Sequence, residues 1–405
     1  MQTNLSEQSK LLPRAEEADK ILRTCVHCGF CNATCPTYQL LGDELDGPRG
    51  RIYLIKQVLE GAPATAKAQL HLDRCLTCRN CETTCPSGVD YHNLLDIGRA
   101  VIDQAVPRPA GQRLLRQGLR ALAPNPNLFK TLLQIGATFQ PLLPRGVAAK
   151  LPHDLPATGE RPAPRHARRV LMLEGCVQPG LSPNTNAATA RVLDRLGISV
   201  IAVPEAGCCG ALDYHLDAQA MGLNRARHNI DAWWPHLENG AEAIVQTASG
   251  CGAFIKDYGH LLERDPLYAA KARRVSERAL DLVQVLADEP LERVCAATDR
   301  RIAFHCPCTL QHAQKLGGAV EAVLMRLGFN LTAVPDSHLC CGSAGTYSIT
   351  QPVLARQLRD NKLNALESGH PEIIATANIG CQSHLNSAGR TPVRHWIELV
   401  DQVLR

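Results

Sequence analysis

Several features that are common in enzymes are missing from this sequence of 405 residues. Aromatic side chains make up 4% of it, and no basic run carries interleaved aromatics, which argues against a nucleic-acid-binding protein. No stretch approaches 18 consecutive apolar residues, so we expect no segment that spans a membrane. Glycine-rich dinucleotide loops, P-loops and nucleophile elbows are also lacking. The polar start, residues 1–4, contains no apolar leader region, and we therefore expect a cytoplasmic protein.

Cysteine, in contrast, is abundant, with 18 residues. In a chain without an export signal this number indicates a reducing compartment in which metal holds the thiols. One spacing, Cys-x2-Cys-x2-Cys-x3-Cys-Pro, occurs twice, at residues 25–36 and 75–86. This run is the signature of bacterial ferredoxins with two clusters, so the sequence predicts two [4Fe-4S] clusters and a role in electron transfer.

The spacing also predicts which cysteines share a cluster. Three thiolates two residues apart can wrap one corner of a cubane, and in two-cluster ferredoxins the fourth cysteine of each run ligates the other cluster. The predicted ligands of the first cluster are Cys25, Cys28, Cys31 and Cys85. Those of the second cluster are Cys75, Cys78, Cys81 and Cys35.

Two other uses of these cysteines fit less well. A disulfide framework belongs to small secreted chains, and this chain is long and has no leader. Structural zinc sites usually take two cysteine pairs separated by a longer loop, which differs from four thiols within eleven positions, twice over.

An internal repeat with three cysteine stations lies between residues 170 and 390. The stations of the first copy are Cys176, Cys208-Cys209-Gly210 and Cys251, and those of the second are Cys308, Cys340-Cys341-Gly342 and Cys381. The interval from the first station to the Cys-Cys-Gly is 32 residues in both copies, and that from the pair to the last station is 42 and 40 residues.

Short apolar or β-branched runs precede the stations, at 170–173, 200–203, 243–245, 302–304, 331–334 and 373–375. Helical periodicity follows at 187–196 and 320–327, each ended by a glycine. Strands that alternate with helices predict a mostly parallel sheet, whose carboxyl-end loops converge. The cysteines of one copy should therefore meet in a soft-metal or redox-thiol site, with the glycine of each Cys-Cys-Gly allowing close backbone approach.

These motifs resemble those of the Cys-Cys-Gly domain proteins related to heterodisulfide reductase, and most closely the iron-sulfur subunits of bacterial glycolate oxidase. The resemblance covers nearly the whole chain. It rests on the two ferredoxin runs and on the stretches 25–31, 207–211, 249–253 and 339–345.

The resemblance implies an electron-transfer subunit beside a flavin subunit that oxidises glycolate to glyoxylate, with electrons leaving to a membrane quinone. The missing dinucleotide loop agrees with a flavin and a 2-hydroxy acid on a partner chain, so no catalytic residue is expected here. The alternatives are the corresponding subunit of a lactate or glycerol-3-phosphate dehydrogenase, a thiol-disulfide reductase of the heterodisulfide type, and a redox-inert scaffold whose Cys-Cys-Gly sites hold zinc.

The chain departs from the heterodisulfide reductase pattern at the end of each repeat, where that pattern has Cys-x-x-Cys. Here Phe254 follows Cys251, and His384 follows Cys381, so each site has one thiolate fewer. His384 or Cys306 could substitute in the second repeat. A further iron-sulfur or zinc centre in this domain is therefore left open, and Cys295, outside the pattern, is predicted to be a buried apolar residue.

Residues 107–170 connect the two cysteine regions and carry eleven Lys and Arg against Asp154 and Glu160, a net charge of +9 that leaves −5 for the rest of the chain. Leucines interleave with these charges, so the stretch could lie on anionic lipid or on a partner, or it could pack as a solvated linker helix. The predicted fold class is α+α/β. We expect a helical two-cluster ferredoxin-like domain at 1–105, a basic amphipathic connector at 106–167 and a tandem Cys-Cys-Gly α/β domain at 168–405, peripheral on the inner face of the cytoplasmic membrane.

Overall fold

The structure is a computed structural model that describes residues 1–140 and 157–405. The chain forms two compact units. The first contains Met1–Arg116 and His338–Leu358, and the second contains Gln117–Ser337 and Arg359–Arg405. Residues 338–358, which carry the second Cys-Cys-Gly, thus group with the N-terminal helices. The domain boundaries at 105 and 167 stay a prediction.

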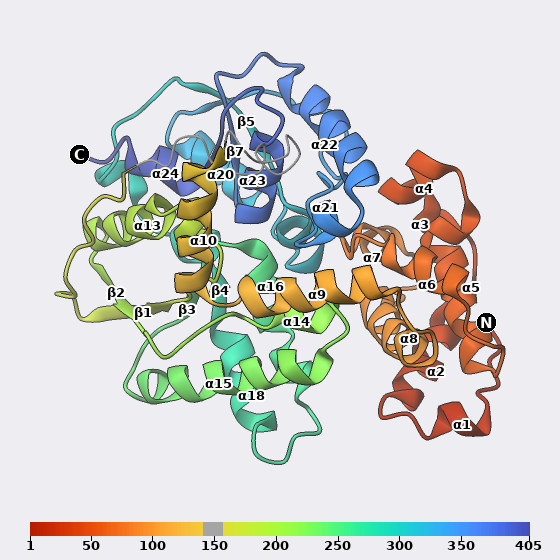
Figure 1. Cartoon of the computed structure of the whole chain (residues 1–405). Helices are drawn as coiled ribbons and strands as arrows, with labels where there is room; N and C mark the ends of the chain where they lie inside the picture. The colour runs from red at the N-terminus through yellow and green to blue at the C-terminus, as the bar shows by residue number, and fades with distance from the viewer. Residues whose placement is uncertain (141–156) are drawn as a thin grey trace. The chain divides into compact units, whose positions relative to one another are not determined.

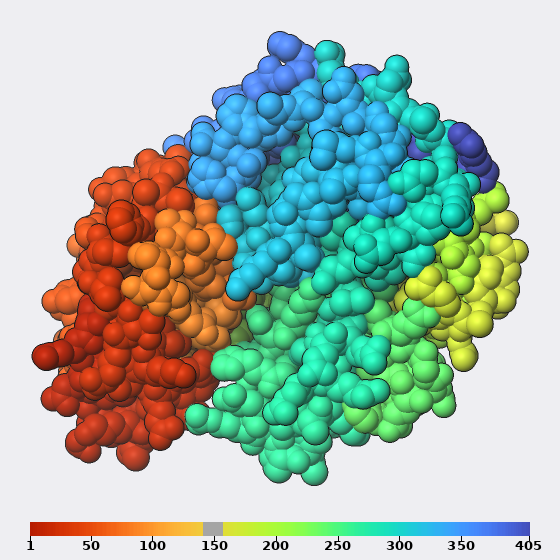
Figure 2. Space-filling model, turned by 180° about the vertical axis from the view of Figure 1, so that it is seen from behind, coloured from red at the N-terminus to blue at the C-terminus, as the bar shows by residue number. Residues whose placement is uncertain are grey.

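The first unit is helical, as predicted for the ferredoxin-like region. Its elements are α1 (Glu7–Lys10), α2 (Ala15–Thr24), α3 (Phe30–Ala33), α4 (Pro36–Leu41), the 3-10 helix η1 (Glu44–Asp46), α5 (Pro48–Leu59), α6 (Ala66–Asp73), α7 (Asn80–Thr84), α8 (Tyr91–Ala105) and α21 (Tyr347–Thr350). Figure 2 shows the N-terminal residues, in red and orange, as a continuous packed body.

Helix α5 shows how the helices of this unit are built. Pro48 occupies the first helical position, where its fixed backbone angle suits the helix and no amide hydrogen is needed. Ile52, Ile55 and Leu59 are buried on one face. Gly98 of α8 lies so close to this face that a Cβ there would be 2.5 Å from Ile55 Cγ1, which explains a glycine inside a helix.

The second unit holds two four-stranded sheets. The strands of the first are β1 (Arg168–Met172), β2 (Ile198–Ala202), β3 (Ile244–Gln246) and β4 (Ala279–Asp281), in the order β2-β1-β3-β4. Those of the second are β5 (Arg301–His305), β6 (Asn330–Leu331), β7 (Ile373–Thr376) and β8 (Val393–His395), in the order β6-β5-β7-β8. All pairings are parallel, and the matching order confirms both the predicted parallel sheet and the repeat.

Helices surround these strands (Figure 1). They are α10 (Pro126–Thr138), α12 (Gln178–Leu181), α13 (Asn184–Arg195), α14 (Ala211–His215), α15 (Gln219–Glu238), α16 (Ser249–Lys256), α17 (Tyr258–Leu261), α18 (Ala269–Arg278), α19 (Leu282–Leu286), η3 (Leu291–Arg293), the π-helix η4 (Thr309–Ala313), α20 (Ala319–Arg326), α23 (Ile379–Asn386) and α24 (Trp396–Asp401). Helices α9 (Ala110–Leu122) and α22 (Pro352–Glu367) each have residues in both units. The helices predicted at 187–196 and 320–327 correspond to α13 and α20.

The two repeats share one hydrophobic core. Val170 and Val245 of the first sheet belong to the same buried cluster as Ile302 and Phe304 of the second, and Trp396 is fully buried there. Burial of such side chains stabilises a fold by roughly 1.5–3 kcal/mol each. The repeats are therefore joined into one packed body within the second unit.

The connector contains two helices, α9 and α10, where the sequence predicts a basic amphipathic stretch. Its residues Arg145, Lys150 and Asp154 lie outside the described residues. Among the described helices, none combines the length and apolar character that a transmembrane span requires.

Candidate iron-sulfur centres

The two ferredoxin runs form loops with matching backbone geometry. His27 and Gly29 in the first loop have φ angles of +62° and +88°, and Thr77 and Arg79, at the equivalent positions of the second, have +50° and +61°. Alternating left-handed residues curl a loop so that successive amides face one side, a concavity found at many iron-sulfur sites. Three of these four residues are not glycine, so the packing around the loops must enforce the conformation.

The first loop encloses a cavity. Its lining includes Cys25, Cys28, Cys31 and Cys85, the four cysteines predicted to share the first cluster. Burial raises the pKa of the Cys31 thiol to about 11, so that a metal bound there would have to displace the thiol proton.

A second cavity is lined by Cys35, Cys75, Cys78 and Cys81, the four cysteines predicted for the second cluster. Cys85 of the second run thus lines the first cavity, and Cys35 of the first run lines the second, while the assignment of these cysteines to particular clusters stays a prediction. Four soft thiol donors around each cavity are the donor set that an iron-sulfur cluster needs.

The two cavities share walls. Pro48, Cys81 and Tyr91 line both of them. The hydroxyl of Tyr91 donates to the Cys75 sulfur at 3.6 Å, and burial raises the pKa of this tyrosine, which keeps the hydroxyl protonated. The two cavities are therefore adjacent within the first unit.

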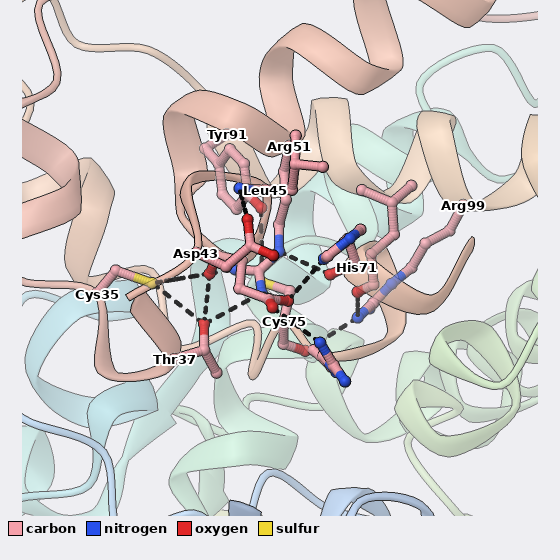
Figure 3. Close-up of polar contacts among 12 residues, drawn as sticks. Cys35, Thr37, Asp43, Leu45, Arg51, His71, Cys75, Tyr91 and Arg99 are labelled. Atoms are coloured by element: carbon pink, nitrogen blue, oxygen red, sulfur yellow. Dashed lines mark hydrogen bonds and ion pairs between the residues drawn. The ribbon is translucent and has the colours of Figure 1, made fainter. Parts of the chain in front are cut away.

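A buried arginine lies at the second cavity (Figure 3). Arg51, which is 1% exposed, donates from Nε to the carbonyl of His71 at 2.7 Å and from Nη2 to Thr37 Oγ1 at 3.1 Å, while Nη1 lies 3.9 Å from the sulfur of Cys35. A guanidinium stays charged in proteins. The second cavity therefore has a fixed positive charge in its wall.

Asp46 is the buried counter-ion of this arginine. Its Oδ1 lies 3.5 Å from Arg51 Nη2 and 3.0 Å from His71 Nδ1, and its Oδ2 accepts from Arg74 at 2.9 Å. Arg51 and Arg74 thus flank the Asp46 carboxylate, and an oxygen of the Asp43 carboxylate lies within 4.8 Å of it. The two carboxylates match the two cations in number, and Arg51 is the cation of this group that lies next to a cavity sulfur.

Residues 338–358 contribute to this same unit. Asn80 of the second loop donates to the carbonyl of His338 at 3.2 Å and to that of Thr34 at 3.0 Å. Burial raises the pKa of Tyr347, and the charges of Arg51, Cys75 and Cys340 also act on its hydroxyl. The second Cys-Cys-Gly loop thus belongs to the surroundings of the second cavity.

In the second unit, the four cysteines of the first repeat meet. Cys176, Cys208 and Cys251 follow the carboxyl ends of β1, β2 and β3, and hydrogen bonds link Cys176 to Cys208, Cys208 to Cys209, and Cys209 to Cys251. The bonds from Cys176 and Cys209 lower the pKa of Cys208 to about 3. Four buried or half-buried sulfurs at one sheet edge fit a soft metal centre.

The glycine of this Cys-Cys-Gly has the role that the sequence predicts. Gly210 has a φ of +96°, and a Cβ there would lie 2.5 Å from the carbonyl oxygen of Gly222 in α15. Gly342 of the second copy has a φ of +85°, and its Cβ would lie 2.7 Å from the carbonyl oxygen of Ala355. Only glycine allows both the left-handed angle and the close approach.

Phe254 stands where the related pattern has its closing cysteine. It is 5% exposed and packs against Tyr214 and Tyr258 with ring centroids at 5.3 and 5.8 Å, while Tyr258 donates to the carbonyl of Cys209 at 2.5 Å. An aromatic wall supports the Cys-Cys loop here, so the first repeat offers four thiols.

The second repeat places Cys308 after β5 and Cys381 in α23 after β7, at the equivalent sheet edge of the second unit. His305, at the end of β5, is 1% exposed, and neither of its ring nitrogens has a hydrogen-bond partner among the described residues. His384 is buried in α23. Cys306 and Cys295 both belong to the shared hydrophobic core, and for Cys295 this confirms the predicted apolar role.

The functional side chains that sequence reasoning missed are Arg51, Tyr91 and Tyr347. Each lies on a helix whose pattern reads as ordinary core packing, and each reaches the cysteines only through the fold. A buried arginine on a helix, such as Arg51 in α5, has no distinctive signal in a single sequence.

A helical unit with two four-cysteine cavities, together with tandem sheets that carry cysteines at their carboxyl edges, defines an iron-sulfur protein with repeated cysteine-rich domains. Comparison with known families agrees. The family described as "4Fe-4S dicluster domain" matches residues 21–89. The family described as "Cysteine-rich domain" matches residues 170–256 and 302–386.

Relatives identify the particular family. The chain is 70% identical to the glycolate oxidase iron-sulfur subunit of Escherichia coli (strain K12), covering 100% of this chain and 99% of the relative. It is 30% identical to the probable glycolate oxidase iron-sulfur subunit of Bacillus subtilis (strain 168), over 92% of this chain and 90% of that one. The chain belongs to the family of glycolate oxidase iron-sulfur subunits.

Two more distant likenesses were found. Lactate utilization protein A of Bacillus velezensis is 28% identical over 55% of this chain and 91% of the relative. A crystal structure of a hypothetical protein from Helicobacter pylori has a TM-score of 0.55 at 10% identity, over 98% of this chain and 74% of that chain, which supports the fold.

Proposed function

We propose that this chain is the electron-transfer subunit of a flavin-dependent glycolate oxidase complex. Its proposed [4Fe-4S] ligands are Cys25, Cys28, Cys31 and Cys85 for the first cluster and Cys75, Cys78, Cys81 and Cys35 for the second. The observation that carries the proposal is the pair of four-cysteine cavities with common walls at Pro48, Cys81 and Tyr91.

Oxidation of glycolate to glyoxylate releases two electrons and two protons. A flavin on a partner subunit would take both electrons, and bound iron-sulfur clusters supply one-electron chemistry, so two adjacent centres can each accept one. On this chain the role of Tyr91 is to line both sites and donate to Cys75. The role of Arg51 is to place positive charge beside the second cavity.

The Cys-Cys-Gly repeats are the proposed exit for these electrons. The surroundings of Tyr347, which include Cys75 and Cys340 within one unit, support a route from the second cluster to this loop. Cys176, Cys208, Cys209 and Cys251 are proposed to hold a further iron-sulfur or zinc centre. For the second copy, Cys308, Cys340, Cys341 and Cys381 remain ligands proposed from the sequence.

The proposed acceptor is a membrane quinone, with the complex in the cytoplasm and peripheral on the inner face of the membrane. Helix α10 supports this placement. One of its faces packs near Gly180 through Phe129 and Leu133. Its other face exposes the large apolar side chains Leu128, Leu132, Ile135 and, just beyond the helix end, Phe139. Such a face can lie in the headgroup region of a bilayer.

Low-temperature EPR of the anaerobically purified complex tests the central proposal. Cubane signals that appear on addition of glycolate, and that are weaker on addition of lactate, would support both electron transfer through the clusters and glycolate as the substrate. Signals raised by dithionite alone would mean that the clusters exist but the partner assignment is wrong.

The Cys-Cys-Gly step is tested separately with Cys208→Ser. We expect glycolate still to reduce the cubanes while quinone reduction stops. Iron and zinc counts on the same protein distinguish a redox centre from a zinc scaffold. Loss of the cubanes in this variant would show that the repeat domain is structural.

A lactate-linked role is the second candidate, because lactate utilization proteins are among the relatives. The EPR comparison with lactate decides between them. A thiol-disulfide reductase is less well supported, since Phe254 occupies the place of the closing cysteine in the first repeat.

A further inference from the structure

One cluster cysteine differs from all the others in its exposure. The described residues include all 18 cysteines, and among them Cys28 alone is exposed. Cys28 lines the first cavity. Its counterpart in the second run, Cys78, is 9% exposed. Of the two cavities, the first is therefore the one with an exposed cysteine in its wall.

Large apolar side chains surround this exposed cysteine. Val26 is 66% exposed, Phe30 64% and Tyr53 45%, and the ring of His27, between Val26 and Cys28, meets the Tyr53 ring edge-on at 6.1 Å. We call Val26, Cys28, Phe30 and Tyr53 the rim patch. Single exposed apolar residues are ordinary, but a group around one exposed cysteine indicates an interaction site.

The second run shows what happens when the same loop is covered. The positions of Val26 and Phe30 correspond to Leu76 and Asn80, which are 4% and 3% exposed. Asn80 is covered by the chain's own segment 338–358, because it donates to the carbonyl of His338. The first loop has the same pattern of left-handed residues and carries apolar side chains, Val26 and Phe30, at both positions, yet both are exposed.

Two arginines near the patch in the sequence are paired with carboxylates. Arg49, which lines the first cavity, makes two hydrogen bonds to Glu44 at 2.6 and 3.0 Å, and Arg23 binds Asp19 at 2.6 Å. An anionic membrane would favour cations that remain available. An apolar centre with a paired polar edge is instead typical of a protein-protein interface.

We infer that the rim patch is the docking surface for the flavin-bearing subunit, which delivers its electrons at Cys28. This inference rests on the proposed function and names the place where the partner binds. A second copy of this chain would bring no electrons to the site, whereas a flavin partner supplies both the electrons and the apolar surface that the patch needs.

The test uses the full complex with Phe30→Glu, and Tyr53→Glu as a second variant that lies outside the cysteine loop. Leu11→Glu is the matched control, because Leu11 is an apolar residue of the same unit that is 86% exposed and is not part of the rim patch. Iron content and dithionite-reduced EPR establish that both clusters remain. Co-purification and titration with the flavin subunit measure binding.

We expect both patch variants to bind the flavin subunit at least about tenfold more weakly than Leu11→Glu does, the loss of roughly one buried apolar contact. Equal binding by all three proteins would overturn the inference. Altered self-association, or altered binding to anionic vesicles, with flavin-subunit binding intact would overturn it too, since another occupant would then use the patch. The binding readout needs no glycolate, so a complex that binds normally but is not reduced by glycolate would contradict the proposed function and leave the docking surface supported.

Discussion

Replacing Arg51 by leucine should lower the reduction potential of the second cluster. The guanidinium lies 3.9 Å from the Cys35 sulfur and is 1% exposed, so solvent screens it little. Reduction adds a negative charge next to this cation. Removal of the cation therefore makes the reduced state less favourable.

The size of the effect follows from the distances. Two unit charges 4 Å apart interact by about 4 kcal/mol at an effective dielectric constant of about 20. Asp46 lies 3.5 Å from Arg51 and offsets part of this, and the added electron is spread over a cluster, so about 1–2 kcal/mol remains. This corresponds to roughly a tenfold change in the ratio of reduced to oxidised cluster, or about 60 mV for a one-electron centre.

The assay is an EPR-monitored redox titration with mediators on the purified protein. One of the two centres should move to lower potential in Arg51→Leu and stay close to its original value in Arg51→Lys, which keeps the charge. Arg49→Leu is the control at the first cavity. The side chain of Arg49 is 34% exposed and paired with Glu44. Its removal should therefore change the ratio of reduced to oxidised cluster at either centre by less than about threefold. An unchanged potential in Arg51→Leu with full iron content would refute the electrostatic reasoning.

Three further predictions concern stability and membrane binding. Gly210→Ala should destabilise the second unit by about 1–3 kcal/mol in a denaturant titration, because of its φ of +96° and its contact with Gly222, whereas Gly118→Ala, in an open helical position, should be neutral or stabilising. Burial raises the pKa of Asp281 to about 6. The folded state therefore holds this proton more tightly than the unfolded state, and the protein loses stability as the pH rises from about 4 to 6. Asp281→Asn should stabilise the protein by up to about 3 kcal/mol at pH 7.5 and should have little effect at pH 4. Phe139→Glu should weaken co-sedimentation with anionic vesicles several-fold without changing either cluster signal, and equal sedimentation would contradict a role for α10 in docking.

The sequence predicts much of this fold because its signals are local. A cysteine spacing fixes which thiols can face one cavity, and the exchange of Cys35 and Cys85 between runs follows from it. Likewise, apolar runs between helical segments predict parallel strands, and six of the eight strands lie where the sequence places them. The two missed strands, β4 and β8, come after the last cysteine of each repeat, so no cysteine station marks them in the sequence.

What the sequence could not give depends on distant packing. The grouping of 338–358 with the N-terminal helices depends on contacts such as that of Asn80 with His338, which join residues 258 positions apart. The position of Arg51 depends on the carbonyl of His71 and on Thr37, each from a different segment. Neither arrangement leaves a trace in spacing or periodicity.

The two cavities differ in ways that together favour one direction of electron flow. The first has an exposed cysteine, Cys28, in its wall, beside an arginine that is already paired, while the wall of the second contains the buried guanidinium of Arg51. Transfer of an electron from the first site to the second should lower the free energy, because the cation at the second site stabilises the reduced form. The second cavity also adjoins the segment that carries Cys340. We therefore predict entry at the surface, transfer across Tyr91 and exit through residues 338–358, and a wild-type titration in which the first centre has the higher potential would contradict this order.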